Sequence, residues 1–189
     1  MEAGSDWAGW GPLLLKVGAA AVLLFWIVGA YNRLVRLRGA IGGAWAQIDE
    51  LLARRSFLLE ALADAVRGPL ADEGMTLATL GQADQRQRSA ALSVRARPSH
   101  SPALVAWVLA EAELASPMAR LQALIEQRPE LAGSEPVLPL QRQLLELAPR
   151  LIYARQLFSD AAEAYNAALE EFPTRAVGRL FGMRAASRL

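Results

Sequence analysis

The strongest pattern of hydrophobic and polar positions is the stretch from Trp7 to Ala30, which is almost entirely apolar. Between residues 12 and 30 the one charged side chain is that of Lys16. A helix needs about 20 mostly apolar residues to cross a bilayer, and Lys16, near one end, can extend its amine to the interface. Aromatic side chains suited to the headgroup regions flank the stretch, namely Trp7, Trp10, Trp26 and Tyr31. The pattern predicts a transmembrane helix over residues 12–31.

The charges around this stretch distinguish a membrane anchor from a cleaved signal peptide. Val28-Gly29-Ala30 loosely resembles a cleavage site, but Glu2 and Asp6 precede the stretch, whereas a signal peptide begins with a basic segment. Three arginines follow the stretch, namely Arg33, Arg36 and Arg38. By the positive-inside rule they predict a single-pass anchor, with a short tail of residues 1–11 outside and a domain of residues 32–189 inside.

Downstream of the anchor, apolar positions alternate spacings of three and four residues. This alternation is typical of the buried face of a long helix packed on other helices. In the first helix the face comprises Leu34, Leu37, Ile41, Trp45, Ile48, Leu52, Arg55, Leu59, Leu62 and Val66. No proline separates this face from the anchor, so we predict one continuous helix, with Gly42–Gly43 as the place for a bend. Gly68–Pro69 ends it.

Two shorter helices are predicted in the middle of the chain. The first extends from residue 70 or 72 to about residue 95, and the polar residues 82–88 interrupt its apolar face. The remaining positions of that face are Leu77, Leu80, Ala91 and Val94. The second helix begins with Ser101 as a capping residue and Pro102 at the first helical position. Pro117 is expected to kink or restart it.

The last long helix has a second regular apolar face. We predict it from residue 139 to residue 172, with a kink near Pro149, because a proline inside a helix leaves one carbonyl without its partner. The face comprises Leu140, Leu144, Leu147, Leu151, Ala154, Phe158, Ala161, Tyr165, Ala168 and Phe172. A short amphipathic segment follows, and its apolar side comprises Val177, Leu180, Phe181 and Met183.

These elements predict an all-α protein. Its transmembrane helix is continuous with an elongated antiparallel bundle of about four long helices plus a short C-terminal helix. The first and last helices of the bundle have apolar faces of similar length and are expected to lie side by side. The chain shows no alternating pattern of useful length for a β-strand.

Composition narrows the possible chemistry. The formal net charge is +1, and without residues 1–31 it becomes +2, because Glu2, Asp6 and Lys16 contribute −1. A domain so close to neutral is a poor partner for nucleic acid. The chain has no cysteine and one histidine, His100, in a loop rich in proline and serine. We therefore predict no catalytic residues, no metal, no cofactor and no small-molecule substrate, hence a protein that is not an enzyme.

A few polar residues on the predicted faces need partners, namely Asp49, Arg54, Arg55 and Arg155. Arg55 occupies a position of the buried face, and a buried arginine must be paired. We expect its partner to be Asp49, Glu50 or a carboxylate of the last helix. Recognition of an anionic ligand is the alternative. Arg155, with Tyr153 nearby, is expected to pair with an acid of the first helix.

These residues also carry a resemblance to a known family. The motifs are Tyr31-Asn32-x-Leu34-Val35-x-Leu37-Arg38, Ala44-Trp45-x-x-Ile48-Asp49, Leu52-x-Arg54-Arg55, Glu126-x-x-Pro129-x-Leu131, Ala154-Arg155, Tyr165-Asn166 and Leu180-Phe181-Gly182-Met183. In these motifs and their spacing, residues 32–189 resemble the LemA family of bacterial membrane proteins. The chain departs from the family pattern at Glu60, Ala61, Asp72, Ala148, Pro149, Phe158 and Ser159.

The resemblance implies one N-terminal helix in the bacterial inner membrane and a long helical domain on its cytoplasmic side. It implies no catalytic activity and supplies no functional residues to transfer. One branch of the family is associated with shaping the magnetosome membrane, which favours a scaffolding role.

Three hypotheses of function follow. The first is a membrane-anchored scaffold or adaptor, whose partners are the lipid bilayer and either a second copy of the chain or another membrane protein. The second is a sensor in which the anchor passes a tilt or rotation to the bundle, with Pro117 and Pro149 as hinges. The third is an enzyme whose site a partner completes.

Overall fold

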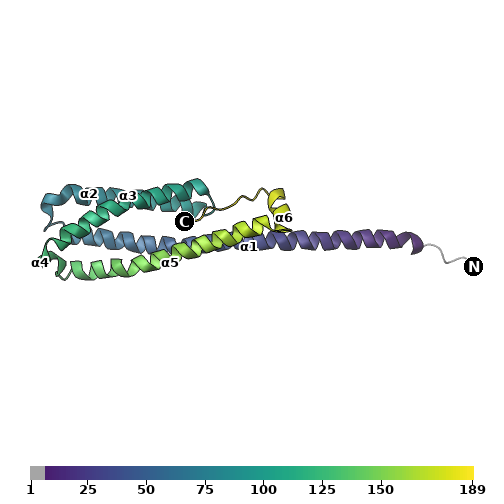
Figure 1. Ribbon diagram of the computed structural model, residues 1–189, viewed down its shortest axis with the longest axis horizontal. Coiled ribbons are helices and arrows are strands. Elements are labelled where there is room, and N and C mark those ends of the chain that lie inside the picture. The colour runs from purple at the N-terminus through teal and green to yellow at the C-terminus, as the bar shows by residue number, and fades with distance from the viewer. Residues whose placement is uncertain (1–6) are drawn as a thin grey trace, which may run out of the picture.

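The computed structural model describes the backbone of residues 7–189 and the side chains of residues 13–189. Within residues 7–189 every regular element is a helix and none is a strand (Figure 1). The all-α prediction is therefore confirmed for this part of the chain. Residues 1–6 of the predicted tail, and the side chains of Trp7 and Trp10 expected at one membrane interface, lie outside the described residues.

Helix α1 (Trp7–Val66) contains both the predicted anchor and the first helix of the bundle. It continues without a break through Gly42–Gly43, and its N-terminal part extends beyond all other helices (Figure 1). This part is long and apolar enough to cross a membrane, and 6% of its most apolar 18-residue window is buried. Such an exposed apolar surface is unfavourable in water and compatible with a membrane anchor.

The predicted apolar face of α1 packs against the rest of the bundle from residue 34 onward. Its members Leu34, Ile41, Trp45, Ile48, Leu52, Leu59, Leu62 and Val66 are buried. Leu37 and Arg55 are half-buried. The alternation of three and four residues thus identified the correct side of this helix.

Helix α5 (Val137–Glu170) lies along α1, as expected for the first and last long helices (Figure 1). Arg33 of α1 is paired with Glu171, just after the end of α5, and Arg54 lies beside Gln143 near its start. The two helices therefore run in opposite directions. The predicted face of α5 is buried from Leu147 onward, except that Ala162 is more buried than Ala161 and Phe172 is exposed.

Neither internal proline ends its helix. Pro117 lies within α3 (Ser101–Glu126), so the restart expected there is wrong. Pro149 lies within α5. Each proline removes one backbone hydrogen bond, but Glu113 and Leu145, four residues earlier, are exposed. The two carbonyls left without an amide partner thus lie on exposed turns, where water can hydrate them.

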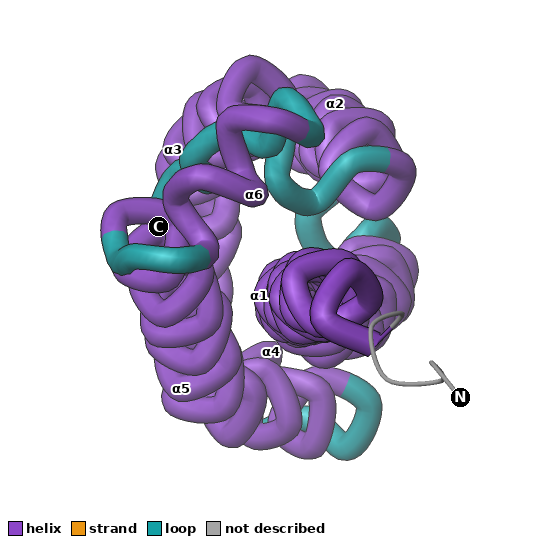
Figure 2. Tube along the Cα trace, turned by 90° about the vertical axis from the view of Figure 1, so that its right-hand side faces the viewer, coloured by secondary structure: helices purple, strands orange, loops and turns teal. Residues whose placement is uncertain are grey.

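Helix α2 (Gly74–Ala96) follows a 3₁₀ turn at Ala71–Glu73 and packs along α3 (Figures 1 and 2). The structure places His100 at the capping position of α3, so the predicted cap at Ser101 is wrong by one residue. The Ser101 hydroxyl accepts a hydrogen bond from Ser187 at 2.7 Å instead. Helix α4 (Pro129–Ala132) connects α3 to α5.

Helix α6 (Thr174–Leu180) folds back onto α1 after the end of α5 (Figure 1). Val177 is buried and Met183 is packed against the core, as predicted. Leu180 and Phe181, expected on the same apolar side, are exposed. The apolar side of this short segment is therefore only partly packed against the core.

The bundle contains two hydrophobic cores. The proximal core, nearer the N-terminal part of α1, includes Trp45, Trp107, Phe158 and Tyr165. The distal core, nearer α4, is built from aliphatic side chains of α1, α2, α3 and α5 and the α4 region. The first core ends on α1 at Leu52 and the second begins at Leu59.

Candidate functional site

Polar side chains lie on α1 between the two cores, and further polar residues of α2, α3 and α5 meet them. We call this set the polar layer, and it comprises Arg55, Ser56, Asp84, Gln87, Glu111 and Arg155. Ser56, Asp84 and Gln87 are buried, and the side chains of Arg55 and Glu111 are each 12% exposed. Groups this far from water must be satisfied by one another.

Glu111 holds the two arginines of the polar layer. Both Arg55 Nη atoms donate to its carboxylate, and Arg155 Nη2 donates to the same oxygen, Oε2, that Arg55 Nη1 contacts at 3.1 Å. Arg155 also lies over the ring of Trp107, with its guanidinium carbon 5.0 Å from the ring centroid. Because one carboxylate faces two guanidinium groups, this part of the layer carries one excess positive charge.

The partners predicted for these arginines were wrong. Arg55 was expected to pair with Asp49, Glu50 or an acid of the last helix, and Arg155 with an acid of the first helix. Both pair with Glu111 of α3. The prediction considered acidic residues of the first and last helices and omitted Glu111 of α3. Trp107 and Glu111 in fact reach both helices from one side of α3.

The α2 side of the polar layer is a second hydrogen-bonded group. The Ser56 hydroxyl donates to Asp84 Oδ1 at 2.7 Å, and Arg88 contacts the other carboxylate oxygen at 2.7 Å. Gln87 lies next to them with no exposed surface, and neither its amide nitrogen nor its oxygen has a protein partner. The layer is thus well paired at Asp84 and poorly paired at Gln87.

The other predicted polar residues lie in exposed pairs. Asp49 contacts Arg95 of α2 at 3.5 Å, and Arg54 donates to Gln143 of α5 at 3.0 Å. Among the arginines expected beside the anchor, Arg33 is paired with Glu171, and Arg36 and Arg38 are exposed, as Arg33 is. Exposed pairs of this kind stabilise a fold by about 0–1 kcal/mol, so they position the helices without forming a site.

A groove extends from the polar layer toward α4. Its walls are α3, from Trp107 to Glu126, and α5, from Leu138 to Ser159, and its floor includes Leu59 and Leu62 of α1. The cavity has a volume of about 1150 Å³. Further lining side chains are mostly apolar and include Val108, Leu114, Met118, Leu121, Ile125, Leu144, Leu145, Leu147, Leu151 and Ile152. Leu145 and Ile152 are 67% and 69% exposed on its rim.

The polar end of the groove has more donors than acceptors. Arg55 Nε, Arg155 Nε and Trp107 Nε1 are buried and have no acceptor among the described protein atoms. All three residues line the groove. The groove therefore combines apolar walls with a cationic end, which favours an occupant that is apolar and carries an acidic group.

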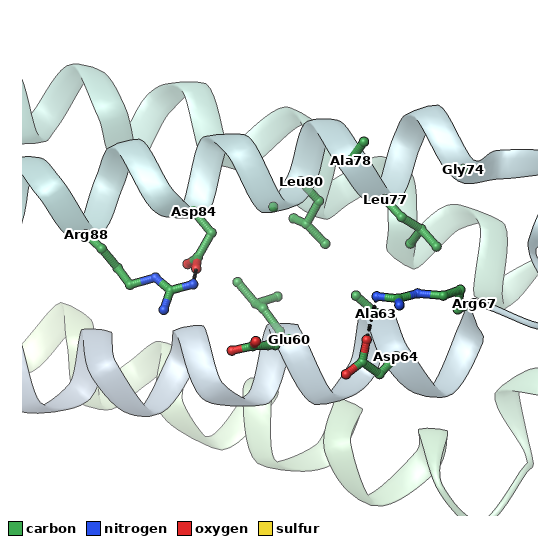
Figure 3. A pocket seen from close by; sticks show the side chains of 12 residues that line it. Glu60, Ala63, Asp64, Arg67, Gly74, Leu77, Ala78, Leu80, Asp84 and Arg88 are labelled. Atoms are coloured by element: carbon green, nitrogen blue, oxygen red, sulfur yellow. Dashed lines mark hydrogen bonds and ion pairs between the residues drawn. The ribbon is translucent and has the colours of Figure 1, made fainter.

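A smaller cleft of about 510 Å³ lies between α1 and α2 (Figure 3). An ion pair lies toward each end, Arg88 with Asp84 and Arg67 with Asp64, and Glu60 lies between them. These charges are mutually compensated except for that of Glu60. In the part of the chain that the structure describes, no group of histidine, cysteine and acidic residues is suited to a metal ion.

Sequence reasoning missed Glu111, Asp84 and Gln87. Glu111 lies four residues after Trp107 and three before Leu114, which is the spacing of a buried face. Asp84 and Gln87 likewise complete the series from Leu80 to Ala91 in steps of four, three and four. The periodicity that placed Arg55 on the buried face of the first helix thus also includes these three polar residues of α2 and α3.

Over residues 7–189, fold and site together define an all-helical protein in which α1 is long and apolar enough to span a membrane and a polar layer divides the bundle. Residues 44–189, well over half of the chain, match the LemA family. The chain therefore belongs to the LemA family, as the sequence resemblance indicated. No curated protein matches it.

Proposed function

We propose that the protein is a membrane-anchored scaffold, whose elongated antiparallel bundle holds an amphipathic helix of a partner protein in the groove between α3 and α5. The observation that carries the proposal is the groove itself. It is apolar, has a cationic end, and is not filled by any segment of the described chain. In this proposal the protein carries out no reaction. Arg55 and Arg155, which are paired with Glu111, contribute to the binding of the partner helix.

The dimensions of the groove favour a helix as its occupant. Its lining residues on α5 run from Leu138 to Ser159, which corresponds to about 32 Å of helix at 1.5 Å per residue. This is the length of a helix of roughly 20 residues. A compact metabolite would fill a small part of such a channel, whereas an amphipathic helix can lay its apolar face along the whole of it.

Charge indicates which helix fits. The charged lining residues are Arg55, Arg142 and Arg155 against Glu111 and Glu126, a net charge of +1. The excess lies at the polar layer, where the Nε atoms of Arg55 and Arg155 have no protein acceptor. An aspartate or glutamate near one end of the partner helix would compensate the excess positive charge of the two guanidinium groups. Charge complementarity therefore selects an acidic amphipathic helix over a basic one.

Site-specific crosslinking in the native membrane tests this proposal. The photoreactive residue p-benzoylphenylalanine replaces Ile152 on the groove rim or, as a control, the similarly exposed Leu92 on α2. We expect a discrete adduct from position 152 and none from position 92. The Ala115→Trp substitution, which fills the groove, should abolish the adduct, whereas Ala106→Trp on an exposed position of α3 outside it should not.

Mass spectrometry of the adduct decides the identity of the occupant. A crosslinked segment of another protein with apolar residues at helical spacing and an acidic residue supports the proposal. An adduct with a second copy of this chain, an adduct insensitive to Ala115→Trp, or no adduct at position 152 overturns it.

The proposed location is the bacterial inner membrane, with α1 spanning the bilayer and the bundle in the cytoplasm. Its support is the apolar N-terminal part of α1 and the arginines that follow it, Arg33, Arg36 and Arg38. The chain has no cysteine, so a single cysteine at Leu92 reports its side of the membrane. An impermeant maleimide should label it only after the cells are opened. Labelling in intact cells would indicate the opposite orientation, with the bundle outside the cytoplasm.

A sensor is the second candidate, because anchor and bundle share the unbroken helix α1. A change in the tilt of the anchor would then be transmitted along α1 to the groove. Spin labels at positions 92 and 145 measure the distance between α2 and α5 in nanodiscs of two thicknesses. Two populations whose ratio follows bilayer thickness, and changes in Pro149→Ala, support a sensor. One unchanged population in both bilayers contradicts it.

A further inference from the structure

The turn from α5 into α6 leaves large apolar side chains uncovered. Phe172 and Leu180 are each 73% exposed, and Phe181 is 53% exposed. We call these three residues the corner surface. They lie close together in the fold, on one short helix and its two flanking turns. Three large side chains so close together form a patch, whereas single exposed apolar residues are ordinary.

Two ring contacts join the corner surface to the predicted anchor. The Phe172 ring lies on that of Trp26, with centroids 4.9 Å apart, and the Phe181 ring lies on that of Tyr31 at 4.8 Å. Trp26 and Tyr31 are the aromatic residues expected at the inner membrane interface. Figure 1 shows α6 resting on α1 where α5 ends and α1 continues alone. The corner surface therefore lies beside the last turns of the anchor.

The two contacts also order the corner surface in depth. Trp26 and Tyr31 are five residues apart on α1, or about 7.5 Å along its axis. Phe172 is thus placed beside a deeper turn of the anchor than Phe181. A corner of this kind reaches into the headgroup region without crossing the bilayer.

The fold holds the corner surface firmly against α1. The Thr174 hydroxyl donates to the carbonyls of Ala168 and Glu171, which fixes the turn out of α5. A Cβ on Gly178 would lie 2.7 Å from Cδ2 of Leu169, so glycine lets α6 approach the end of α5 closely, while Leu34 of α1 lies 3.7 Å from the same position.

The C-terminal end of α6 is capped by backbone hydrogen bonds. The Met183 amide donates to the Gly178 carbonyl at 2.8 Å and the Gly182 amide to Arg179, with Gly182 at a φ of +62°. This is a Schellman motif, which requires the left-handed conformation that glycine adopts without strain.

Basic residues lie near the corner surface in the sequence and on the adjoining turns of α1. Arg175, Arg179 and Arg184 follow Phe172 in the sequence, and Arg33 and Arg36 lie on the adjoining turns of α1. The acidic residues nearby are Glu170 and Glu171, and Glu171 is paired with Arg33. The local charge is therefore positive, since five arginines oppose two glutamates. Anionic lipid headgroups attract such a cluster, and Trp, Phe and Leu enter the interface beneath them.

We propose that the corner surface inserts into the headgroup region beside the anchor, so that the bundle contacts the lipid surface at a second point. The proposal rests on the proposed anchoring of α1. With two points of contact, the bundle stands at a fixed angle to the membrane and does not swivel on a single helix.

Spin-label accessibility in nanodiscs with anionic lipid tests this contact on the full chain. Single cysteines at positions 180 and 181 carry the label. Position 22 in the anchor and position 92 on α2 serve as references. Leu92 is 60% exposed, and its helix packs near Asp49, 18 residues beyond Tyr31 or about 27 Å along α1. Oxygen concentrates in lipid and a nickel chelate remains in water, so their collision ratio reports depth.

We expect the oxygen-to-nickel ratio at positions 180 and 181 to lie between those of positions 22 and 92, severalfold above position 92. The ratio should fall when Arg175 and Arg179 are both replaced by glutamine. A ratio at position 180 equal to that at position 92, with position 22 still in lipid, overturns the corner contact and leaves the anchor intact. A water-exposed position 22 would overturn the anchor and the corner contact together. Dipolar broadening between labels at position 180 would indicate a second copy and contradict insertion.

Discussion

The proximal and distal cores of the bundle are built from different side chains. In the proximal core the Trp45 ring makes T-shaped contacts with Trp107, at 5.1 Å between ring centroids, and with Phe158, at 6.0 Å. Aromatic rings therefore connect α1, α3 and α5. The distal core contains buried leucine, isoleucine, valine and alanine and no buried aromatic residue. The groove begins at Trp107 and extends along this aliphatic half.

The difference shows how side-chain size sets the spacing of helices. Indole and phenyl rings are large enough to bridge the space between α3 and the α1–α5 pair, and they close the proximal half. In the distal half aliphatic side chains cover α1, and the groove lies between α3 and α5. The polar layer lies where one type of packing gives way to the other.

Trp45→Ala should have the largest effect on stability. Trp45 is 1% exposed and contacts both Trp107 and Phe158. Its removal leaves a closed cavity, which costs about 4 kcal/mol of the free energy of unfolding. Leu62→Ala in the distal half should cost about 2 kcal/mol, because Leu62 lines the groove and its space opens to water.

Urea unfolding of the full chain in one detergent, followed by circular dichroism, measures both values. Trp45→Phe serves as the control, since it keeps an aromatic ring between α1 and α3 and should lose less than half as much. Equal losses for Trp45→Ala and Leu62→Ala would contradict the distinction between the two cores.

Glu111→Gln should have the next largest effect. The substitution leaves two guanidinium groups, one of them 12% exposed, facing a neutral amide. Breaking a buried ion pair costs about 3 kcal/mol at the low end of its usual range. Asp49→Asn, which breaks the exposed pair with Arg95, should cost less than about 1 kcal/mol. The same urea titrations compare them, and similar losses would show that the polar layer does not join α3 to α1 and α5.

Sequence reasoning succeeded where buried positions are apolar and failed where they are polar. The faces of α1 and α5 were predicted well, because a long regular alternation of apolar residues has one interpretation. The four apolar positions predicted for α2 are also buried or packed against the core, but the prediction for α2 and α3 omitted Asp84, Gln87 and Glu111, polar side chains at buried or nearly buried positions. A polar residue at a buried position is informative only once its partner is known, and the partners here lie 28 and 56 residues away.

The groove and the corner surface were not predictable from sequence. Both depend on distances between helices that side-chain size determines in three dimensions. The sequence placed Leu180 and Phe181 on the apolar side of the last segment, the side of a helix that ordinarily faces a core. Their exposure became visible only when α6 was placed against Tyr31.

Gln87→Leu should stabilise the protein. Gln87 is fully buried, and its amide has no protein partner. Replacing such a group with an apolar side chain of similar size removes a desolvation cost of about 1 kcal/mol. Ser56→Ala should have the opposite sign by about the same amount, because it leaves Oδ1 of Asp84 without its donor. Thermal unfolding midpoints measure the difference. A lower midpoint for Gln87→Leu would show that the amide contributes to the polar layer.

The smallest predicted effect concerns Glu73, near the distal core, where polar contacts take the place of the aromatic rings. Hydrogen bonds from the Thr76 hydroxyl and then from Arg120 lower the pKa of Glu73 from its usual 4.5. A carboxyl whose pKa is lower in the folded state stabilises the fold above its unfolded pKa and loses that contribution as the pH falls through the folded value. Glu73→Gln should therefore be less stable than the unmodified chain at pH 7. The two should converge below pH 4.5. Urea titrations at both pH values measure this convergence, and a constant difference would mean that Glu73 acts through its shape and not its charge.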